Sequence, residues 1–382
     1  MHSGLREHPL RHALTEELHA RPFARIEAPQ WATHLALLSG EDAGQTDHGH
    51  VAALCRRFDR PPPAETETYY LVDLGAFQLR WERHTEFSSY TFFVRPDAAS
   101  EAVGPDRFAK TALDAVPSDW LEGLAGELLV GTHLILDPRG AAQPEPDSLV
   151  EIFGTDNLAG SLVSGAAAVA FLDFRIHGDG FGRILVCDQG MRPRQAGRLI
   201  QRLHEIETYC ALALLALPMA RRYGRELTEA GARLSEMTGR LAGPGGLEDE
   251  RRLLGTLTEL SAEVERIAAV ANYRFGAARA YYTLVRRRVE ELRETRVKGL
   301  QTVEEFLERR LAPAMRTCQA TAERLDTLSV RLSRTGDLLR TRVDIQLEAQ
   351  NSALLQSMDR RARLQLRLQQ TVEGLSVAAF KA

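Results

Sequence analysis

The sequence contains little cysteine and no long apolar run. Its 4 cysteines are far apart, with neither a CxxC pair nor a Cys/His metal spacing, and they are Cys55, Cys187, Cys210 and Cys318. This distribution favours free thiols in a reducing compartment over a disulfide scaffold or a zinc site. Because no run of about 18 consecutive apolar residues occurs, we expect no complete membrane span within these residues.

The motifs of several enzyme classes are also absent. The sequence has no P-loop, no HExxH pair and no nucleophile elbow, which argues against nucleotide hydrolysis and common hydrolase chemistry. Glycines at Gly178, Gly180 and Gly182 invite a dinucleotide-binding interpretation, but the apolar segment Ile184–Cys187 follows them. Since a dinucleotide loop leads into a helix, the run instead predicts a β-hairpin turn. We therefore expect a protein without enzymatic activity.

The overall composition is that of a globular protein with more than one domain. The chain has 382 residues, of which 44% are hydrophobic and 26% are charged. The net charge is -4, and arginines alternate with acidic residues, so no nucleic-acid partner is expected. The N-terminal residues Met1–Leu18 carry scattered charges and do not form a secretory signal.

The first half predicts an α+β fold, namely a mixed α/β head with a largely antiparallel sheet. Segments rich in aromatic and β-branched residues predict strands at Trp31–Ser39, Tyr69–Leu74, Phe77–Arg83, Tyr90–Val94, Glu127–Leu136, Leu149–Phe153, Ala167–His177 and Ile184–Cys187. The side chains expected in the core are those of Val72, Leu74, Leu79 and Trp81. Tight turns between neighbouring strands favour this class over a doubly wound parallel sheet.

The second half has the three- and four-residue apolar spacing of long, coiled-coil-like helices. We expect a kink at Pro218, a break at Gly243–Gly246, and a bend or a new helix start at Pro313. One apolar stripe follows the last helix through Leu325, Leu328, Leu332, Leu339, Val343, Leu347, Leu354 and Met358. The predicted domains are the head at 1–193, a domain of long antiparallel helices at 194–313, and a stalk helix at 314–380 that leads to an absent membrane anchor.

Three polar groups in the head are candidate sites. Glu17, His19 and Arg21 alternate in an extended segment, which suits either a bound ion or phosphate or a hydrogen-bonded cluster that fixes the N-terminal arm. A second group, Asp47, His48 and His50, has metal-ligand residue types but is interpreted as a solvated loop. The third group alternates along a predicted strand and would share one sheet face, and it comprises Asp173, Arg175, His177 and Asp179.

The stalk carries acidic and basic candidates. Asp337, Asp344 and Glu348 could supply oxygen ligands to a divalent cation such as magnesium between subunits, or could be solvated partners of nearby arginines. An arginine cluster precedes the apolar residues Leu375–Phe380, and it comprises Arg360, Arg361, Arg363 and Arg367. Positive charge is retained on the cytoplasmic side of a membrane helix, so this cluster predicts a membrane-proximal position.

Four stretches resemble a known family. They are ELHARPF at Glu17–Phe23 and the longer segments Gln201–Arg221, Ala271–Glu294 and Leu338–Phe380. On these stretches the chain resembles the bacterial uncharacterised membrane-anchored proteins grouped as domain of unknown function 3422. The resemblance implies a soluble head, helices and a C-terminal transmembrane hairpin, which this sequence lacks. It implies no catalytic residues.

Three functional hypotheses follow. The first is a membrane-anchored, cytoplasm-facing interaction or regulatory protein of the bacterial inner membrane, with a self-associating stalk and hence a homo-oligomeric state. The second is the soluble domain of a CorA-like divalent-cation transporter, which rests on a similar layout alone. The third is an enzyme with a pocket between head and helices, for which the sequence offers no nucleophile or base.

Overall fold

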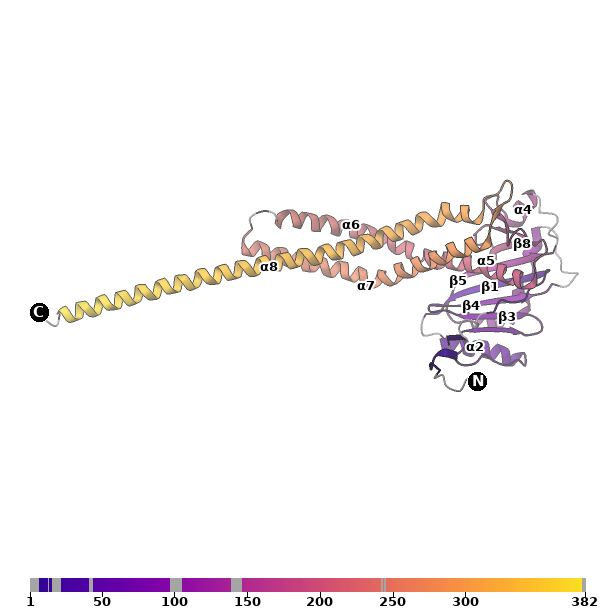
Figure 1. Ribbon diagram of the computed structural model, residues 1–382, viewed down its shortest axis with the longest axis horizontal. Helices are drawn as coiled ribbons and strands as arrows, with labels where there is room; N and C mark the ends of the chain where they lie inside the picture. Colours follow the sequence, from indigo (N-terminus) through magenta and orange to yellow (C-terminus); the bar gives the residue numbers. More distant parts are fainter. Residues whose placement is uncertain are drawn as a thin grey trace. The chain divides into compact units, whose positions relative to one another are not determined.

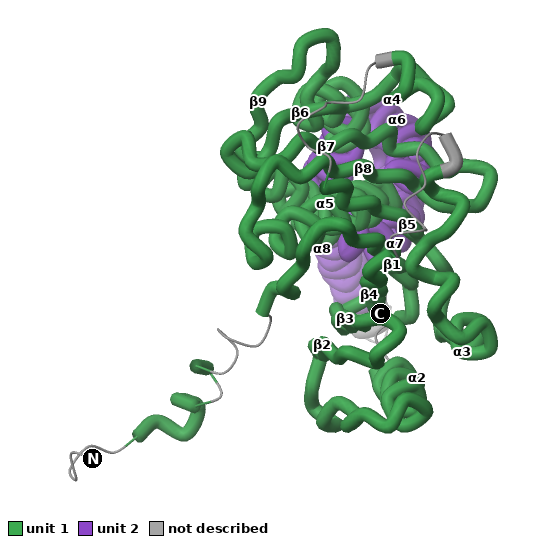
Figure 2. Tube along the Cα trace, turned by 90° about the vertical axis from the view of Figure 1, so that its right-hand side faces the viewer, with its two compact units in different colours: residues 1–215, 277–315 green, residues 216–276, 316–382 purple. Residues whose placement is uncertain are grey.

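The computed structural model describes residues 7–12, 14–15, 22–40, 44–96, 105–138, 146–241, 243 and 245–379. Two compact units are distinguished in Figure 2. Unit 1 comprises residues 1–215 and 277–315, and unit 2 comprises residues 216–276 and 316–382. Two long helices, α7 (Leu247–Leu292) and α8 (Val303–Ala379), contribute residues to both units. The predicted boundaries at 193/194 and 313/314 stay a prediction.

Unit 1 contains one mixed sheet in the described part of the chain (Figure 1). Its strands are β1 (Gln30–Leu38), β2 (Tyr69–Asp73), β3 (Gln78–Arg83), β4 (Phe87–Val94), β5 (Glu127–Asp137), β6 (Ala159–Val163), β7 (Ala168–Leu172), β8 (Gly182–Asp188) and β9 (Thr295–Arg296). Their order across the sheet is β2-β3-β4-β1-β5-β8-β7-β6-β9. All neighbouring pairs are antiparallel except β5 and β8. The predicted α+β class with a largely antiparallel sheet is confirmed.

The other elements are helices. They are α2 (Gly44–Arg57), α3 (Ser118–Glu122), α4 (Pro146–Phe153), α5 (Pro193–Leu214) and α6 (Ala216–Leu241), with short 3-10 turns at Pro105–Phe108 and Ala112–Ala115. α5 begins with a proline at its first helical position, where the missing N–H would have no partner in the helix. A break at Leu215 separates α5 from α6. It lies just before Pro218, whose ring would clash with the carbonyl of Leu214 in a continuous helix.

Two local predictions were wrong. The predicted strand Leu149–Phe153 is the second half of α4, and it packs its apolar side into a core cluster with strand residues such as Phe171 and Leu185. A short apolar run does not by itself distinguish a strand from a buried helix. The predicted strand from Ala167 to His177 ends at Leu172, because Phe174 takes a left-handed backbone conformation with φ 53°.

The sheet is apolar on one face and polar on the other near β1, β3 and β4. Leu79 and Trp81 join the core cluster that also contains Val51 and Leu54 of α2, which confirms them as core. The intervening residues of β3 point to the opposite face, which α5 covers. Successive side chains of a strand alternate between faces, so one strand supplies both the core and a polar layer.

Unit 2 is built from helices alone in the described residues. The glycine-rich break is confirmed, since α6 ends at Leu241 and α7 starts at Leu247. Pro313 lies inside α8, which begins at Val303, so no new helix starts at this proline. The first part of the predicted apolar stripe is buried, with exposed fractions of 0–7% for Leu325, Leu328, Leu332, Leu339 and Val343. Among the described residues, no helix is both long and apolar enough to cross a membrane.

Candidate functional site

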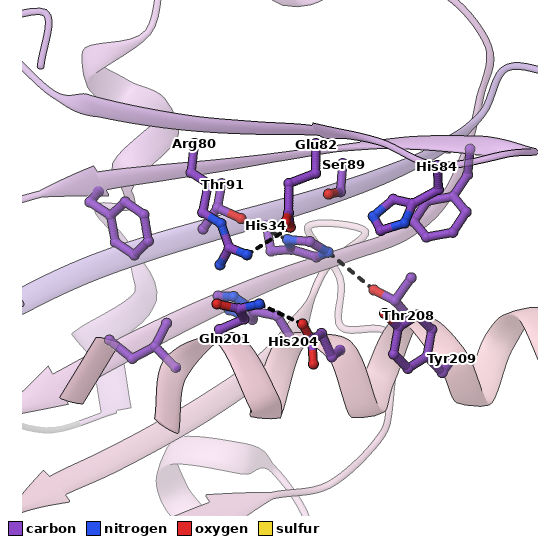
Figure 3. Close-up of a pocket in the computed structure, with 14 residues that line it drawn as sticks. His34, Arg80, Glu82, His84, Ser89, Thr91, Gln201, His204, Thr208 and Tyr209 are labelled. Carbon is purple, nitrogen blue, oxygen red and sulfur yellow. Dashed lines mark hydrogen bonds and ion pairs between the residues drawn. The ribbon is translucent and has the colours of Figure 1, made fainter. Parts of the chain in front are cut away.

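A layer of buried polar side chains lies between the sheet and α5. Figure 3 shows it, with His34 from β1, Arg80 and Glu82 from β3, and His204 and Thr208 from α5. We call these five residues the histidine cluster. Taken as whole residues, all five are less than a tenth exposed, which is unusual for charged residues without a specific role.

The two imidazole rings stack on each other. The ring centroids of His34 and His204 are 4.8 Å apart, with an interplanar angle of 13°. His34 is held at both nitrogens, because Nδ1 lies 2.9 Å from Thr91 Oγ1 and Nε2 lies 3.1 Å from Thr208 Oγ1. Neither ring nitrogen of His204 has a hydrogen-bond partner in the described part of the chain. The stack therefore joins a fixed imidazole to one with unused hydrogen-bonding capacity.

An ion pair adjoins the stack. Arg80 Nη2 lies 2.8 Å from Glu82 Oε2, and the two side chains are 5% and 11% exposed. Burial, followed by the nearby charge of Arg80, lowers the pKa of His34 to about 3. Burial also lowers the pKa of His204 well below its ordinary value, with His34 and Arg80 adding to the effect. Both imidazoles are therefore neutral near pH 7.

The space beside these residues is small. The cavity has a volume of ≈ 20 Å³, and a site needs about 10–15 Å³ to hold one water molecule. An organic substrate does not fit. The arrangement instead forms a polar connection between α5 and the sheet that resists protonation.

Acidification should destabilise unit 1 through these histidines. An unfolded histidine binds its proton below about pH 6.5, whereas the folded His34 binds it only near pH 3. Between about pH 6.5 and pH 3 the unfolded state therefore binds more protons than the folded state. The free energy of unfolding is highest above about pH 6.5 and decreases as the pH is lowered through this range. At pH 5 His34 alone should lower the free energy of unfolding by about 2 kcal/mol, and His204 should lower it further. Urea unfolding at several pH values measures this loss.

The variant His204→Phe provides the matched comparison. A phenyl ring retains the stack on His34 and removes two buried nitrogens without partners, so the variant should be at least as stable as the natural protein at pH 7. Its stability should fall less steeply below pH 6.5 than that of the natural protein, because one histidine no longer titrates. Equal pH slopes for the two proteins would show that His204 is not buried in a neutral form.

The comparison with known proteins gives a family and no activity. A family model described as "Protein of unknown function (DUF3422)" matches residues 6–381. The chain belongs to the DUF3422 family. No curated protein and no solved structure matches it. The DUF3422 description assigns no function to any residue, so the site must be argued from its chemistry.

The structure of this DUF3422 member describes some of the predicted site residues and not others. Glu17, His19 and Arg21 lie outside the described residues. Within the described part of the chain, no group of three or more His, Cys, Asp or Glu residues is placed to hold a metal ion. Asp337 is 3.6 Å from Arg340, and both Asp344 and Glu348 are exposed. A magnesium site between subunits would involve a second chain, and it stays a prediction.

The remaining polar candidates in the head form hydrogen bonds and ion pairs within unit 1. The predicted loop at Asp47 is part of α2, where the carboxylate accepts a hydrogen bond from Ser88 Oγ at 2.5 Å and lies 3.2 Å from Arg83. His50 Nε2 lies 2.8 Å from the carbonyl oxygen of Trp120. The predicted shared face of Asp173 and His177 does not form, because β7 ends at Leu172, but the loop brings the two side chains to 2.9 Å.

The arginine cluster of the DUF3422 chain lies on the exposed surface of α8. Arg360, Arg361, Arg363 and Arg367 are all exposed, and Arg363 pairs with Asp359 at 2.8 Å. Their predicted membrane-proximal position is not tested by these contacts.

Sequence reasoning missed the histidine cluster. Arg80 and Glu82 alternate with Leu79 and Trp81, a pattern normally read as a solvent-exposed face. The usable signal was on α5, where His204 and Thr208 are four residues apart and so share one helix face.

Proposed function

We propose that this protein is a membrane-anchored, cytoplasm-facing interaction or regulatory protein that self-associates through α8. The supporting observation is an uncovered segment of α8, residues 348–370, in which every residue is exposed. Its large apolar side chains are each at least 59% exposed, and they are Leu354, Leu355, Met358, Leu364, Leu366 and Leu368. So many exposed leucines within a few turns are typical of an interaction surface.

The covering helices of unit 2 end where this segment starts. Arg342 donates a hydrogen bond to the carbonyl oxygen of Leu241 at 2.5 Å and lies 2.8 Å from Glu250. Gln346 donates to the carbonyl oxygen of Gly245 at 3.3 Å. α8 therefore passes the connection between α6 and α7 at these residues. Beyond them, no described element of unit 2 lies alongside it.

The uncovered segment is suited to packing against the same segment of a second copy of the chain. The upstream part of α8 buries leucines such as Leu328 and Leu332 with the spacing of helix packing, and Leu354 and Met358 continue it. A second copy would bring the same apolar pattern, as in a coiled coil. The segment is too charged to enter the hydrocarbon of a bilayer, because it carries Asp359 and four exposed arginines.

The anchor and the cytoplasmic side are part of the same proposal. The exposed arginines from Arg360 to Arg367 support it, because clustered positive charge is favoured beside the anionic cytoplasmic leaflet. Cell fractionation of the natural protein tests it. Recovery only in the soluble fraction would contradict the anchor.

Charged substitutions in the uncovered segment should separate the copies. The double variant Leu354→Glu with Met358→Glu places four like charges in a two-copy interface and removes four buried apolar side chains. We expect the dissociation constant to rise about a thousandfold or more. Light scattering over a range of protein concentrations measures this change.

The matched control is the double variant Val330→Glu with Leu338→Glu. These side chains are also on α8 and are 49% and 67% exposed, but they lie where α6 and α7 accompany the helix. The control should keep the oligomeric state of the natural protein. A natural protein that stays monomeric at high concentration would contradict self-association.

A further inference from the structure

Unit 1 contains a second, much larger cavity, and all of its lining residues belong to that unit. It lies among β5, the loop that follows β7, the last turns of α5 and the first turns of α8. Its volume is ≈ 560 Å³, within the range of about 300–1,000 Å³ typical of small-molecule sites. We call it the arginine groove, because Arg175 and Arg310 are part of its lining.

Most of the lining is apolar. The ring of Phe306 stacks on Phe174 at a centroid distance of 4.8 Å, which forms an aromatic wall. Three further apolar side chains stay open to solvent, since Leu128, Ile176 and Leu214 are 51%, 77% and 36% exposed. An apolar surface that is both concave and accessible suits the hydrocarbon part of a ligand.

The two acidic side chains of the groove do not offer a charged oxygen to a ligand at pH 7. The Asp173 side chain is fully buried, with Oδ2 2.9 Å from His177 Nε2 and Oδ1 accepting a hydrogen bond from the backbone N–H of Arg175 at 3.2 Å. Burial, and then the charge of Asp173, raise the pKa of Glu207 to about 8. Glu207 is therefore mostly protonated at pH 7, and its carboxyl group can donate a hydrogen bond.

The two arginines keep unused N–H donors. Arg310 donates from Nη2 to Asn157 Oδ1 at 2.8 Å and lies over the Phe306 ring, with Cζ 3.9 Å from the centroid. These contacts hold its guanidinium beside the aromatic wall. The other N–H groups of Arg310, and the exposed guanidinium of Arg175, have no hydrogen bond or ion pair in the part of the chain that the structure describes. Since arginine keeps its proton in proteins, both groups are positively charged.

We propose that the arginine groove binds an amphipathic carboxylate of the fatty-acid type, with its hydrocarbon chain against Phe174 and Phe306 and its carboxylate beside the guanidinium of Arg310. A guanidinium binds a carboxylate through two parallel N–H···O hydrogen bonds, and Arg175 adds positive potential to the same groove. An ammonium head group would be repelled by both arginines, and an alcohol would form no ion pair. This proposal concerns unit 1 and is independent of the self-association of α8.

Calorimetric titration with octanoate at pH 7 tests the proposal, with octanol and octylammonium as probes of the same chain length. We expect octanol and octylammonium to bind at least tenfold more weakly than octanoate. Raising the salt concentration from about 0.05 M to about 0.5 M should weaken octanoate binding several-fold without weakening octanol binding, because salt screens the attraction between charges. Octylammonium that binds as tightly as octanoate would overturn the proposal.

The variant Arg310→Gln locates the carboxylate, and Arg309→Gln is its matched control. Arg309 is the adjacent residue of α8, is also exposed and is not part of the lining. Arg310→Gln should bind octanoate at least tenfold more weakly and octanol within twofold of the natural protein, whereas Arg309→Gln should bind both as the natural protein does. Arg175→Gln, in the loop, should also weaken octanoate binding. Octanoate affinity that is unchanged in both Arg310→Gln and Arg175→Gln would overturn the proposal.

Discussion

Replacing Gly197 by alanine should destabilise unit 1 by at least about 3 kcal/mol. Gly197 lies on α5 where the N-terminal segment crosses the helix, and an added Cβ would lie 1.9 Å from the carbonyl oxygen of Ala24. Backbone atoms cannot give way as a flexible side chain does. The segment would have to leave α5, which would expose Ala24 and Ile26 and break the hydrogen bond from Ile26 N to the carbonyl oxygen of Pro193.

Urea unfolding of Gly197→Ala measures this loss, and Gly49→Ala is its control. Gly49 lies in α2, also in unit 1, and an added Cβ would meet no atom within 4 Å. Because alanine favours the helix over glycine, the control should be stabilised by about 0.5–1 kcal/mol. A loss below about 1 kcal/mol for Gly197→Ala would mean that the crossing segment is not packed against α5 in solution.

The substitution Glu82→Leu should cost about 3–5 kcal/mol, because it leaves the buried Arg80 guanidinium without its counter-charge. Arg80 has few other partners, and its Nε atom has no hydrogen bond among the described residues. Desolvation of an unpaired charge is far more costly than the loss of one surface ion pair. Urea unfolding at pH 7 is the measurement.

The double variant Arg80→Leu with Glu82→Leu separates the charge effect from packing. With both charges gone, the double variant should recover most of the stability lost by Glu82→Leu alone, since apolar replacements of a buried ion pair are often neutral or stabilising. The coupling between the two sites should then be several kcal/mol. If the double variant is as unstable as the single one, Glu82 contributes through packing rather than through its charge.

Local patterns predicted features of both units. Alternation identified β3 and placed Leu79 and Trp81 in the core, and the Gly-rich segment correctly separated α6 from α7. These features depend on neighbours in the sequence. The segment Leu149–Phe153 was assigned to a strand because its short apolar run fits either a strand or a buried helix.

The candidate sites depend on residues far apart in the sequence. Arg80 and Glu82 are buried only because α5 covers their face of the sheet, and His204 meets His34 from that helix. Nothing near β3 in the sequence indicates this cover. Asp173 and Glu207 likewise come together across the α5 packing, which strand alternation alone could not predict.

The strand β9 affects how the sheet can form during synthesis. β9 pairs with β6, and Ser161 donates a hydrogen bond to Glu294, which is 133 residues later in the chain. While the chain is being translated, β6 must remain an open edge until the helical segments between them have left the ribosome. An open strand edge is a template for aggregation. The nascent chain therefore has a long period during which chaperone protection of β6 would matter most.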